Sequence, residues 1–245
     1  MIRKNKIPIV DGQAPTKDVS LAITAVVPIS NQSVVDWFHQ LHHTKAWYTT
    51  WLGFQIMKNP FDMWMYQQII VENKPDFIVE TGTLLGGSAL YMASLCDLLD
   101  NGKVITIDDL SYVEEGITRE EYVASLPQHK RITYLRGNSV SASIIRQIKD
   151  CIGHNQKVMV VLDSDHSKEH VLKELQLYSQ LVTTGQYLIV EDTNVNGHPI
   201  DASHGPGPWE AVQEWIPEHS DFKIDKGCER YLVTWNPDGY LRKIK

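Results

Sequence analysis

The sequence predicts an α/β fold built on a mainly parallel β-sheet, and three observations lead to this class. Asp76–Ser88 begins as the apolar run Phe77–Val79, passes through Glu80 into a glycine-rich turn, and continues into a helical apolar pattern. Strand-like and helix-like segments alternate along most of the chain, which is typical of parallel sheets with helical crossovers. The run Lys157–Leu162 is continuously apolar, as expected for a parallel strand buried on both faces.

Each further element follows from a local pattern. A strand is expected where a short apolar run ends in polar residues, and a helix where apolar residues recur at helical spacing. With Phe77–Val79, the expected strands number seven, the last pair closing the sheet with a terminal antiparallel strand: Lys103–Asp108, Arg131–Leu135, Lys157–Leu162, Gln186–Val190, Phe222–Ile224 and Tyr231–Trp235. The expected helices are Phe61–Asn73, one through Leu90–Leu99, a short one within Ser111–Leu126, Val140–Lys149, Glu169–Leu181, and one that starts at Trp209 after Gly205–Pro208.

The chain is expected to divide near residue 60. Residues 1–60 read as an N-terminal extension that packs on the main domain or on another subunit, with an edge strand or arm at Leu21–Ser30 and a helix at Ser33–His43. Residues 61–245 form the α/β domain. Aromatic residues are dense around this boundary, and core or subunit packing is the first explanation for them. Substrate stacking by Trp51 or Trp64 is the alternative.

Composition narrows the function classes. The 245 residues are 42% hydrophobic and 22% charged, as in an ordinary globular protein, and the net charge of −7 disfavours nucleic acid and membrane surfaces as partners. No window approaches a membrane span, and Pro8 and Asp11 interrupt the basic N-terminus before an apolar signal core. The three scattered cysteines give neither a disulfide framework nor a zinc spacing, so a reducing cytoplasm is expected.

The glycine turn after Glu80 predicts a ligand crevice at the carboxyl end of a central strand. A dinucleotide fingerprint needs a glycine two residues after the first one, and Leu84 holds that position relative to Gly82, so a nicotinamide enzyme is disfavoured. Asp108 ends the second strand, about 20–28 residues beyond the glycine loop, where an acid can accept hydrogen bonds from a ribose diol. A plain strand-to-helix turn and a solvated carboxylate are the alternatives.

Two further strand ends carry acidic clusters. VVLDSDHS supplies Asp163, Asp165 and His166, and LIVEDTNVNGHP supplies Glu191 and Asp192. Because the carboxyl ends of adjacent parallel strands share one edge, these side chains are expected to converge beside the glycine loop. Several carboxylates at one point repel unless a cation neutralises them, and oxygen ligands favour Mg²⁺. Acids that cap helices or face water are the alternative.

Several motifs in order resemble the cephalosporin hydroxylase family: ETGTLLGGSALYMASLCDLL, VITIDD, VLDSDHSKEHVLKEL, YLIVEDTNVNGHP and GPGPWEAV. The similarity runs from about Trp47 to Lys245. Despite its title, that family looks like S-adenosylmethionine- and Mg²⁺-dependent O-methyltransferases of antibiotic and sugar hydroxyls. The resemblance therefore implies a Rossmann-like class I methyltransferase fold, a small-molecule hydroxyl as acceptor, and a homo-oligomer. A weaker likeness extends to the catechol and caffeoyl-coenzyme A O-methyltransferases.

The resemblance also implies site residues. The metal set is Asp163, Glu191 and Asp192; Asp192 stands where the related enzymes have an amide, and Asp165 competes with Asp163 as the primary metal ligand. His166 stands three residues beyond Asp163, where related enzymes hold a basic lysine, and is the candidate base beside Asp163. The residues expected to hold the methionine part, the ribose and the adenine of the cofactor, or to lie close to it, are Glu80, Thr81, Gly82, Gly86, Ser88, Asp108, Asn138, Ser139 and Asp165.

Two other functions stay open on the sequence alone. A non-catalytic, cofactor-binding subunit of a biosynthetic complex would share the fold but not need the acidic clusters. A hydroxylase, as in the family title, would use two histidines and a carboxylate on iron. The only H-x-D triplet is His219–Asp221, with no histidine after it and no jelly-roll pattern, which disfavours a hydroxylase.

Overall fold

The computed structural model describes Ser33, Phe38, residues 49–111 and residues 118–245. Its centre is a seven-stranded sheet of order β5-β4-β3-β6-β7-β9-β8. The strands are β3 (Phe77–Thr81), β4 (Lys103–Asp108), β5 (Ile132–Arg136), β6 (Val158–Leu162), β7 (Tyr187–Val190), β8 (Phe222–Ile224) and β9 (Tyr240–Lys243). Strand β9 is antiparallel to both β7 and β8, and the other pairs are parallel. The predicted fold class is confirmed.

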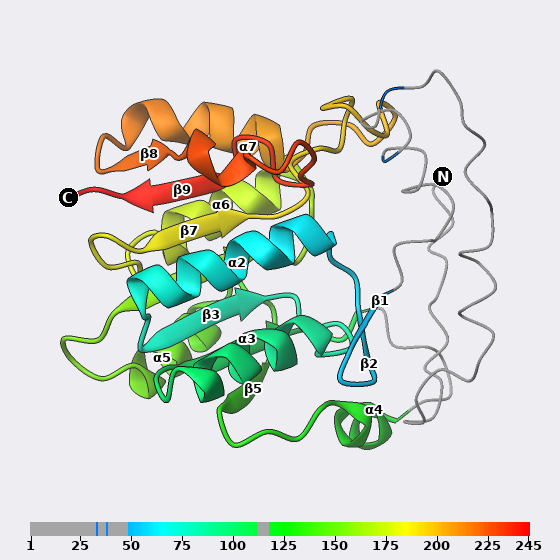
Figure 1. The fold of residues 1–245 in the computed structure, drawn as a ribbon, viewed down its shortest axis with the longest axis vertical. Coiled ribbons are helices and arrows are strands. Elements are labelled where there is room, and N and C mark those ends of the chain that lie inside the picture. The colour runs from blue at the N-terminus through cyan, green and yellow to red at the C-terminus, as the bar shows by residue number, and fades with distance from the viewer. Residues whose placement is uncertain (1–32, 34–37, 39–48, 112–117) are drawn as a thin grey trace.

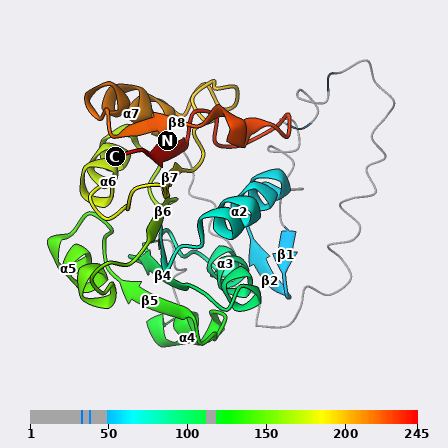
Figure 2. The ribbon, with the colours of Figure 1, turned by 60° about the vertical axis from the view of Figure 1, so that its left-hand side comes forward.

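Helices cover both faces of the sheet (Figures 1 and 2). They are α2 (Pro60–Asn73), α3 (Gly87–Leu98), α4 (Arg119–Ser125), α5 (Ala142–Cys151), α6 (Lys168–Tyr178) and α7 (Pro208–Trp215), with short 3₁₀ turns η2 (Ile216–Glu218) and η3 (Lys226–Glu229). Helices α2 and α3 lie on one face, and α5, α6 and α7 on the other. A two-stranded hairpin, β1 (Thr49–Trp51) and β2 (Phe54–Ile56), packs against α3.

The strand residues alternate between two buried layers, as the period of two in a β-strand requires. In β3, Ile78 packs with α2 and α3, while its neighbour Val79 packs with α5 and α6. Met159 and Val160 of β6 divide in the same way. Because both faces are covered, these strands are apolar at nearly every position, which is why their sequence runs are continuous rather than alternating.

One predicted strand is wrong. Tyr231–Trp235 is irregular, and the strand that closes the sheet is β9, which begins just after the turn at 236–239. Leu232 has φ +74° and is 80% exposed, and a β-branched-rich run alone could not reveal this backbone conformation. The Trp235 backbone N–H donates to Asp62 rather than to a neighbouring strand. Tertiary contacts therefore override the local strand propensity here.

The predictions for the N-terminal part are only partly covered by the described residues. The expected strand at 21–30 and nearly all of the helix at 33–43 lie outside them, as do Trp47 and Tyr48. Trp51 donates from Nε1 to Ser94 Oγ at 3.1 Å and packs edge-on against Tyr91 at a ring-centroid distance of 4.9 Å. This contact with α3 is the packing role expected first. Trp64, by contrast, is 59% exposed. In the described residues, no helix combines the length and the apolar character needed to cross a bilayer.

Candidate active site

The strand register brings the predicted site residues to one edge of the sheet. Thr81 pairs with Leu162, and Leu162 pairs with Val190, so the residues that follow these strands, Asp163 and Glu191, are neighbours. The Glu191 backbone N–H donates to Leu162 O at 3.0 Å, and the Asp163 N–H donates to Thr81 O at 3.1 Å. The two acidic clusters therefore converge beside the glycine loop, as expected for adjacent parallel strands.

Position 82 requires glycine because the backbone of Asp163 lies too close to leave room for a side chain. The φ of Gly82 is +87°, and a Cβ atom would lie 1.8 Å from the carbonyl oxygen of Asp163. A Cβ on Gly87 would lie 2.1 Å from the carbonyl oxygen of Gln55. Any side chain at Gly82 would thus displace the end of β6 together with Asp163. Both glycines keep β3 and α3 close to their neighbours, and the space they leave open lies beside them.

Two hollows flank the glycine loop. The first, of about 250 Å³ and partly open to solvent, is lined by the loop, by Asp163 and by the segment Gln55–Lys58. The second, of about 220 Å³, is bordered by Asp108, Leu110 and Tyr134 with residues of α4. The segment Gln55–Lys58, which the sequence places in the N-terminal extension, thus forms one wall of the crevice. Because the two hollows lie on either side of the loop at Thr83, they suit an extended ligand that crosses the loop.

Glu80 and Asp108 lie near the carboxyl ends of the adjacent strands β3 and β4, beside the loop. Glu80 is fully buried and accepts from Thr106 Oγ1 at 2.7 Å. Burial raises the pKa of Glu80 to about 7, against the opposing effect of the Lys58 charge. Asp108 accepts the backbone N–H of Leu84 at 2.9 Å through Oδ2 and that of Leu110 at 2.7 Å through Oδ1. Asp108 therefore fixes the loop backbone on both sides of the second hollow.

The other predicted cofactor residues serve turns and a buried network. Asn138 Oδ1 accepts from Val140 N at 3.0 Å, and Asp165 Oδ1 accepts from Ser167 N at 2.8 Å at the start of α6. Ser139, 5% exposed, lies 3.0 Å from His170 Nε2. Their positions at the ends of β5 and β6 are as predicted, and their roles toward a cofactor stay predictions.

His166 lies between two of the predicted metal acids. Its Nε2 is 3.5 Å from Asp163 Oδ1, and its Nδ1 is 3.3 Å from Asp192 Oδ2. One ligand atom from each of the three residues falls within 4.8 Å of the others, a spacing that suits a single metal ion. The two carboxylates would fit a divalent cation, and the imidazole of His166 lies beside them.

The charges in this cluster shift its pKa values. Burial alone would lower the pKa of His166, but Asp192 and Asp163 raise it to about 9. Burial raises the pKa of Asp192 to about 7, although the His166 charge opposes this rise. The pKa of Asp163 lies below its usual value because the Lys58 and His166 charges outweigh its burial. While no metal ion lies between Asp163 and Asp192, His166 is protonated at neutral pH and cannot accept a proton.

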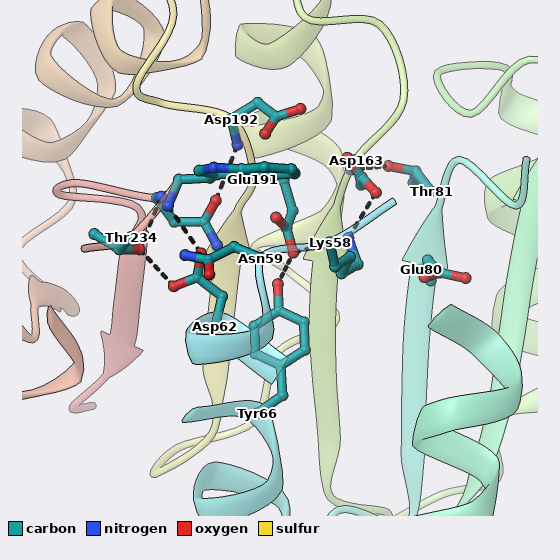
Figure 3. A network of polar contacts seen from close by, with 12 residues as sticks. Lys58, Asn59, Asp62, Tyr66, Glu80, Thr81, Asp163, Glu191, Asp192 and Thr234 are labelled. Atoms are coloured by element: carbon teal, nitrogen blue, oxygen red, sulfur yellow. Dashed lines mark hydrogen bonds and ion pairs between the residues drawn. The ribbon is translucent and has the colours of Figure 1, made fainter. Parts of the chain in front are cut away.

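Lys58 is a site residue that the sequence analysis missed. Its Nζ donates to Asp163 Oδ2 at 2.7 Å and to Glu191 Oε1 at 2.9 Å, and the Tyr66 hydroxyl donates to the same Glu191 oxygen (Figure 3). Burial would lower the pKa of Lys58, but Asp163 and Glu191 raise it well above its usual value. One signal was present: His166 is a single basic residue among several converging acids, so a further positive charge from elsewhere in the chain is expected.

A second buried network anchors the segment that carries Lys58. Asp62, on the first turn of α2, accepts from Asn59 Nδ2 at 2.9 Å, Thr234 Oγ1 at 2.6 Å, Trp235 N at 2.8 Å and Tyr240 OH at 2.9 Å. Asn59 also caps α2 by accepting from the Phe61 N–H. The residue next to Lys58 is therefore tied to the C-terminal part of the chain, which holds the lysine backbone in place (Figure 3).

Comparison with known proteins places this geometry in context. The model of the family described as Rhamnosyl O-methyltransferase/CmcI matches residues 44–244. The chain is 33% identical over 217 residues to "Rhamnosyl O-methyltransferase" of Mycobacterium tuberculosis, covering 86% of this chain and 85% of that protein. It is 31% identical over 225 residues to the protein of the same name from Mycobacterium leprae, covering 89% and 94%.

Solved structures share the fold. A CmcI structure without ligand gives a TM-score of 0.58 at 20% identity, covering 80% of this chain and 76% of that chain. A CmcI structure with Mg-SAM gives a TM-score of 0.57 at 20% identity, covering 80% and 77%. At this identity the likeness extends to the fold.

Proposed function

Because the chain belongs to the Rhamnosyl O-methyltransferase/CmcI family, we propose that it is an S-adenosylmethionine- and Mg²⁺-dependent O-methyltransferase of a small-molecule hydroxyl. Membership of this family also confirms the resemblance on which the sequence analysis relied. The observation that carries the proposal is the Asp163–His166–Asp192 cluster, whose Asp163 also lines the hollow beside the glycine loop. The CmcI structure with Mg-SAM, which has the same fold, supports both cofactors.

The two hollows would hold the cofactor across the glycine loop. Residues Gly82–Leu85 and Ser88 would border its methionine part in the first hollow, and Asp108 would face its ribose beside the second. The residues around the second hollow include Leu110 and Tyr134, whose apolar surfaces suit a purine ring. Asp108 accepts the Leu84 and Leu110 backbone N–H groups, which fixes the orientation of its carboxylate at the border of the second hollow.

Asp163 and Asp192 would hold the metal, with Glu191 as the third predicted ligand. When bound, Mg²⁺ supplies Lewis-acid polarisation of the acceptor hydroxyl, and S-adenosylmethionine supplies an electrophilic methyl group. With a cation held by Asp163 and Asp192, His166 would no longer be their counter-charge, and its pKa would fall toward its ordinary value. His166 then accepts the hydroxyl proton as the acceptor oxygen gains the methyl group and the S–CH₃ bond breaks.

For the acceptor we propose a sugar hydroxyl, because the relatives that share about a third of their residues with this chain are named for rhamnosyl groups. A homo-oligomer in the cytoplasm stays a prediction. The test is to incubate the purified chain with S-adenosylmethionine, Mg²⁺ and a panel of rhamnosides and other glycosides. The expected result is a product that gains one methyl group by mass spectrometry, with an equal amount of S-adenosylhomocysteine.

Other outcomes distinguish the remaining functions. S-adenosylhomocysteine binding by isothermal titration calorimetry without turnover on any acceptor would support a non-catalytic, cofactor-binding subunit. A product that gains oxygen instead of a methyl group would support a hydroxylase. The Asp192→Asn variant is the matched control, because the change removes one ligand charge at nearly constant size.

A further inference from the structure

Lys58 engages only one oxygen of each of two carboxylates. Its Nζ lies 2.7 Å from Asp163 Oδ2 and 2.9 Å from Glu191 Oε1. The Tyr66 hydroxyl donates to the same Oε1 atom, so this oxygen of Glu191 receives two donors. The other oxygen of Asp163, Oδ1, faces His166 Nε2 at 3.5 Å, on the side of the predicted metal site. Lys58 therefore separates the oxygens of Asp163 into one held by the protein and one left for the metal side.

This arrangement is held firmly in place. Lys58 and Glu191 are each 2% exposed, so neither side chain can turn into water. The backbone at Lys58 is confined between β2 and the N-cap of α2, and Asn59 is tied by its side chain to Asp62. A buried ammonium without acidic partners would strongly destabilise the folded state, so the contacts of Lys58 with Asp163 and Glu191 stay formed.

Such outer partners orient metal-binding carboxylates and restrict how they coordinate. A carboxylate with one oxygen hydrogen-bonded to an ammonium offers its other oxygen to a cation first, because two positive charges at the same oxygen repel each other. Mg²⁺ requires near-octahedral geometry and accepts one-oxygen coordination, whereas Ca²⁺ takes six to eight oxygens and commonly binds carboxylates through both. Removing the lysine would free Asp163 Oδ2 for two-oxygen coordination, and would leave Glu191 Oε1 with the Tyr66 hydroxyl as its remaining donor.

We propose that Lys58 is a specificity-determining positioning residue, which selects Mg²⁺ over Ca²⁺ by limiting Asp163 and Glu191 to one-oxygen coordination. The inference rests on the proposed function, because it assumes that these carboxylates face a divalent cation. Lys58 touches neither the cation nor the acceptor in this role. It acts through the two carboxylates that it holds.

The test compares the Kd values of Mg²⁺ and Ca²⁺ for the full chain and for Lys58→Met, measured by isothermal titration calorimetry. Removal of one positive charge changes the attraction for both dications alike, so their Kd ratio isolates the geometric effect. We expect Lys58→Met to shift the ratio at least roughly tenfold toward Ca²⁺, the scale on which outer partners of metal ligands act. A Kd ratio for Lys58→Met that stays within about threefold of the parent value, well short of the expected tenfold change, would overturn the inference.

A second variant and a control complete the design. Lys58→Gln keeps a hydrogen-bond donor that can reach at most one of the two carboxylates, so a smaller shift of the Kd ratio in the same direction is expected. If circular dichroism shows that Lys58→Met is unfolded, the Kd ratio of Lys58→Gln takes its place as the test. Tyr66→Phe leaves Lys58 on Glu191 and should leave the ratio nearly unchanged, and a shift as large as that of Lys58→Met would contradict the role of Lys58. If the parent binds neither cation, the proposed metal site fails, which is a different result from an unchanged ratio.

Discussion

Replacing His166 by alanine in the metal-free chain tests the charge arrangement of the crevice. His166 lies 3.5 Å from Asp163 Oδ1 and 3.3 Å from Asp192 Oδ2, and its side chain is 25% exposed. In the absence of a metal it is the cation that separates these two carboxylates. Its removal leaves them facing each other, which should lower the free energy of unfolding.

The pKa of His166 gives the magnitude and the sign. The two acids raise it from an ordinary value of 6.5 to about 9. A difference of this size corresponds to at most about 3 kcal/mol of stabilisation by the protonated ring. Because the folded-state pKa is the higher one, this stabilisation is complete below about pH 6.5 and is lost as the pH rises through about 9. The free energy of unfolding of the parent should therefore exceed that of His166→Ala by at most about 3 kcal/mol near pH 6 and by almost nothing near pH 10.

Urea denaturation in excess chelator from pH 6 to 10 measures this difference. His154→Ala is the control, because His154 is exposed and its loss should have little effect on stability at any pH. Repeating the series in saturating Mg²⁺ should shrink the difference for His166→Ala, since a bound dication would replace the imidazolium between Asp163 and Asp192. A difference that stays constant across the pH range would refute the assignment of His166 as the counter-charge of these acids.

Three further outcomes are expected. Asp108→Ala should weaken S-adenosylhomocysteine binding, measured by calorimetry, at least about tenfold, which is the scale of one or more hydrogen bonds to a charged group. The neighbouring Asp109→Ala should leave binding unchanged. Equal effects of the two changes would contradict the assignment of Asp108 to the ribose. Excess chelator should abolish methyl transfer, and added Mg²⁺ should restore it. Full turnover in chelator would show that the reaction needs no metal. In a separate binding measurement, Asp192→Asn should bind Mg²⁺ more weakly than the parent. Asp62→Asn should lower the free energy of unfolding by about 2–4 kcal/mol in urea titrations, because the four donors directed at the carboxylate cannot all be satisfied by an amide. Unchanged stability of Asp62→Asn would mean that the α2 anchor is dispensable.

The Asp62 carboxyl also shows why donors and burial must be considered together. Burial raises its pKa to about 6, and the donors from Thr234, Trp235 and Tyr240 act in the opposite direction. The group therefore retains its charge at neutral pH despite being 2% exposed. This carboxylate joins α2 to the chain just before β9, and no local pattern around residue 62 indicates such a partner.

Much of the fold was encoded in local patterns. Short strand-like segments marked β4 and β8 with the bounds that the structure has, and the glycine turn after Glu80 marked the strand-to-helix connection between β3 and α3. The meeting of Asp163 and Glu191 could also be predicted, because adjacent parallel strands end at the same edge and each acid directly follows its strand. These features depend on residue spacing and on the geometry of parallel sheets, both of which are present in the sequence.

Other features depend on contacts between distant residues, and only the tertiary structure decided them. Tyr231–Trp235 has the composition of a strand, but Asp62 takes the amide of Trp235, and β9 forms later in the chain. Lys58 resembles a surface lysine beside a helix cap, yet it is buried against acids 105 and 133 residues further on. Burying an ammonium is favourable only where the fold has already gathered carboxylates, so no window of sequence could reveal it. Likewise, a glycine turn was evident at residue 82. The Asp163 carbonyl that excludes any side chain there directly follows β6, which the folded sheet brings alongside β3.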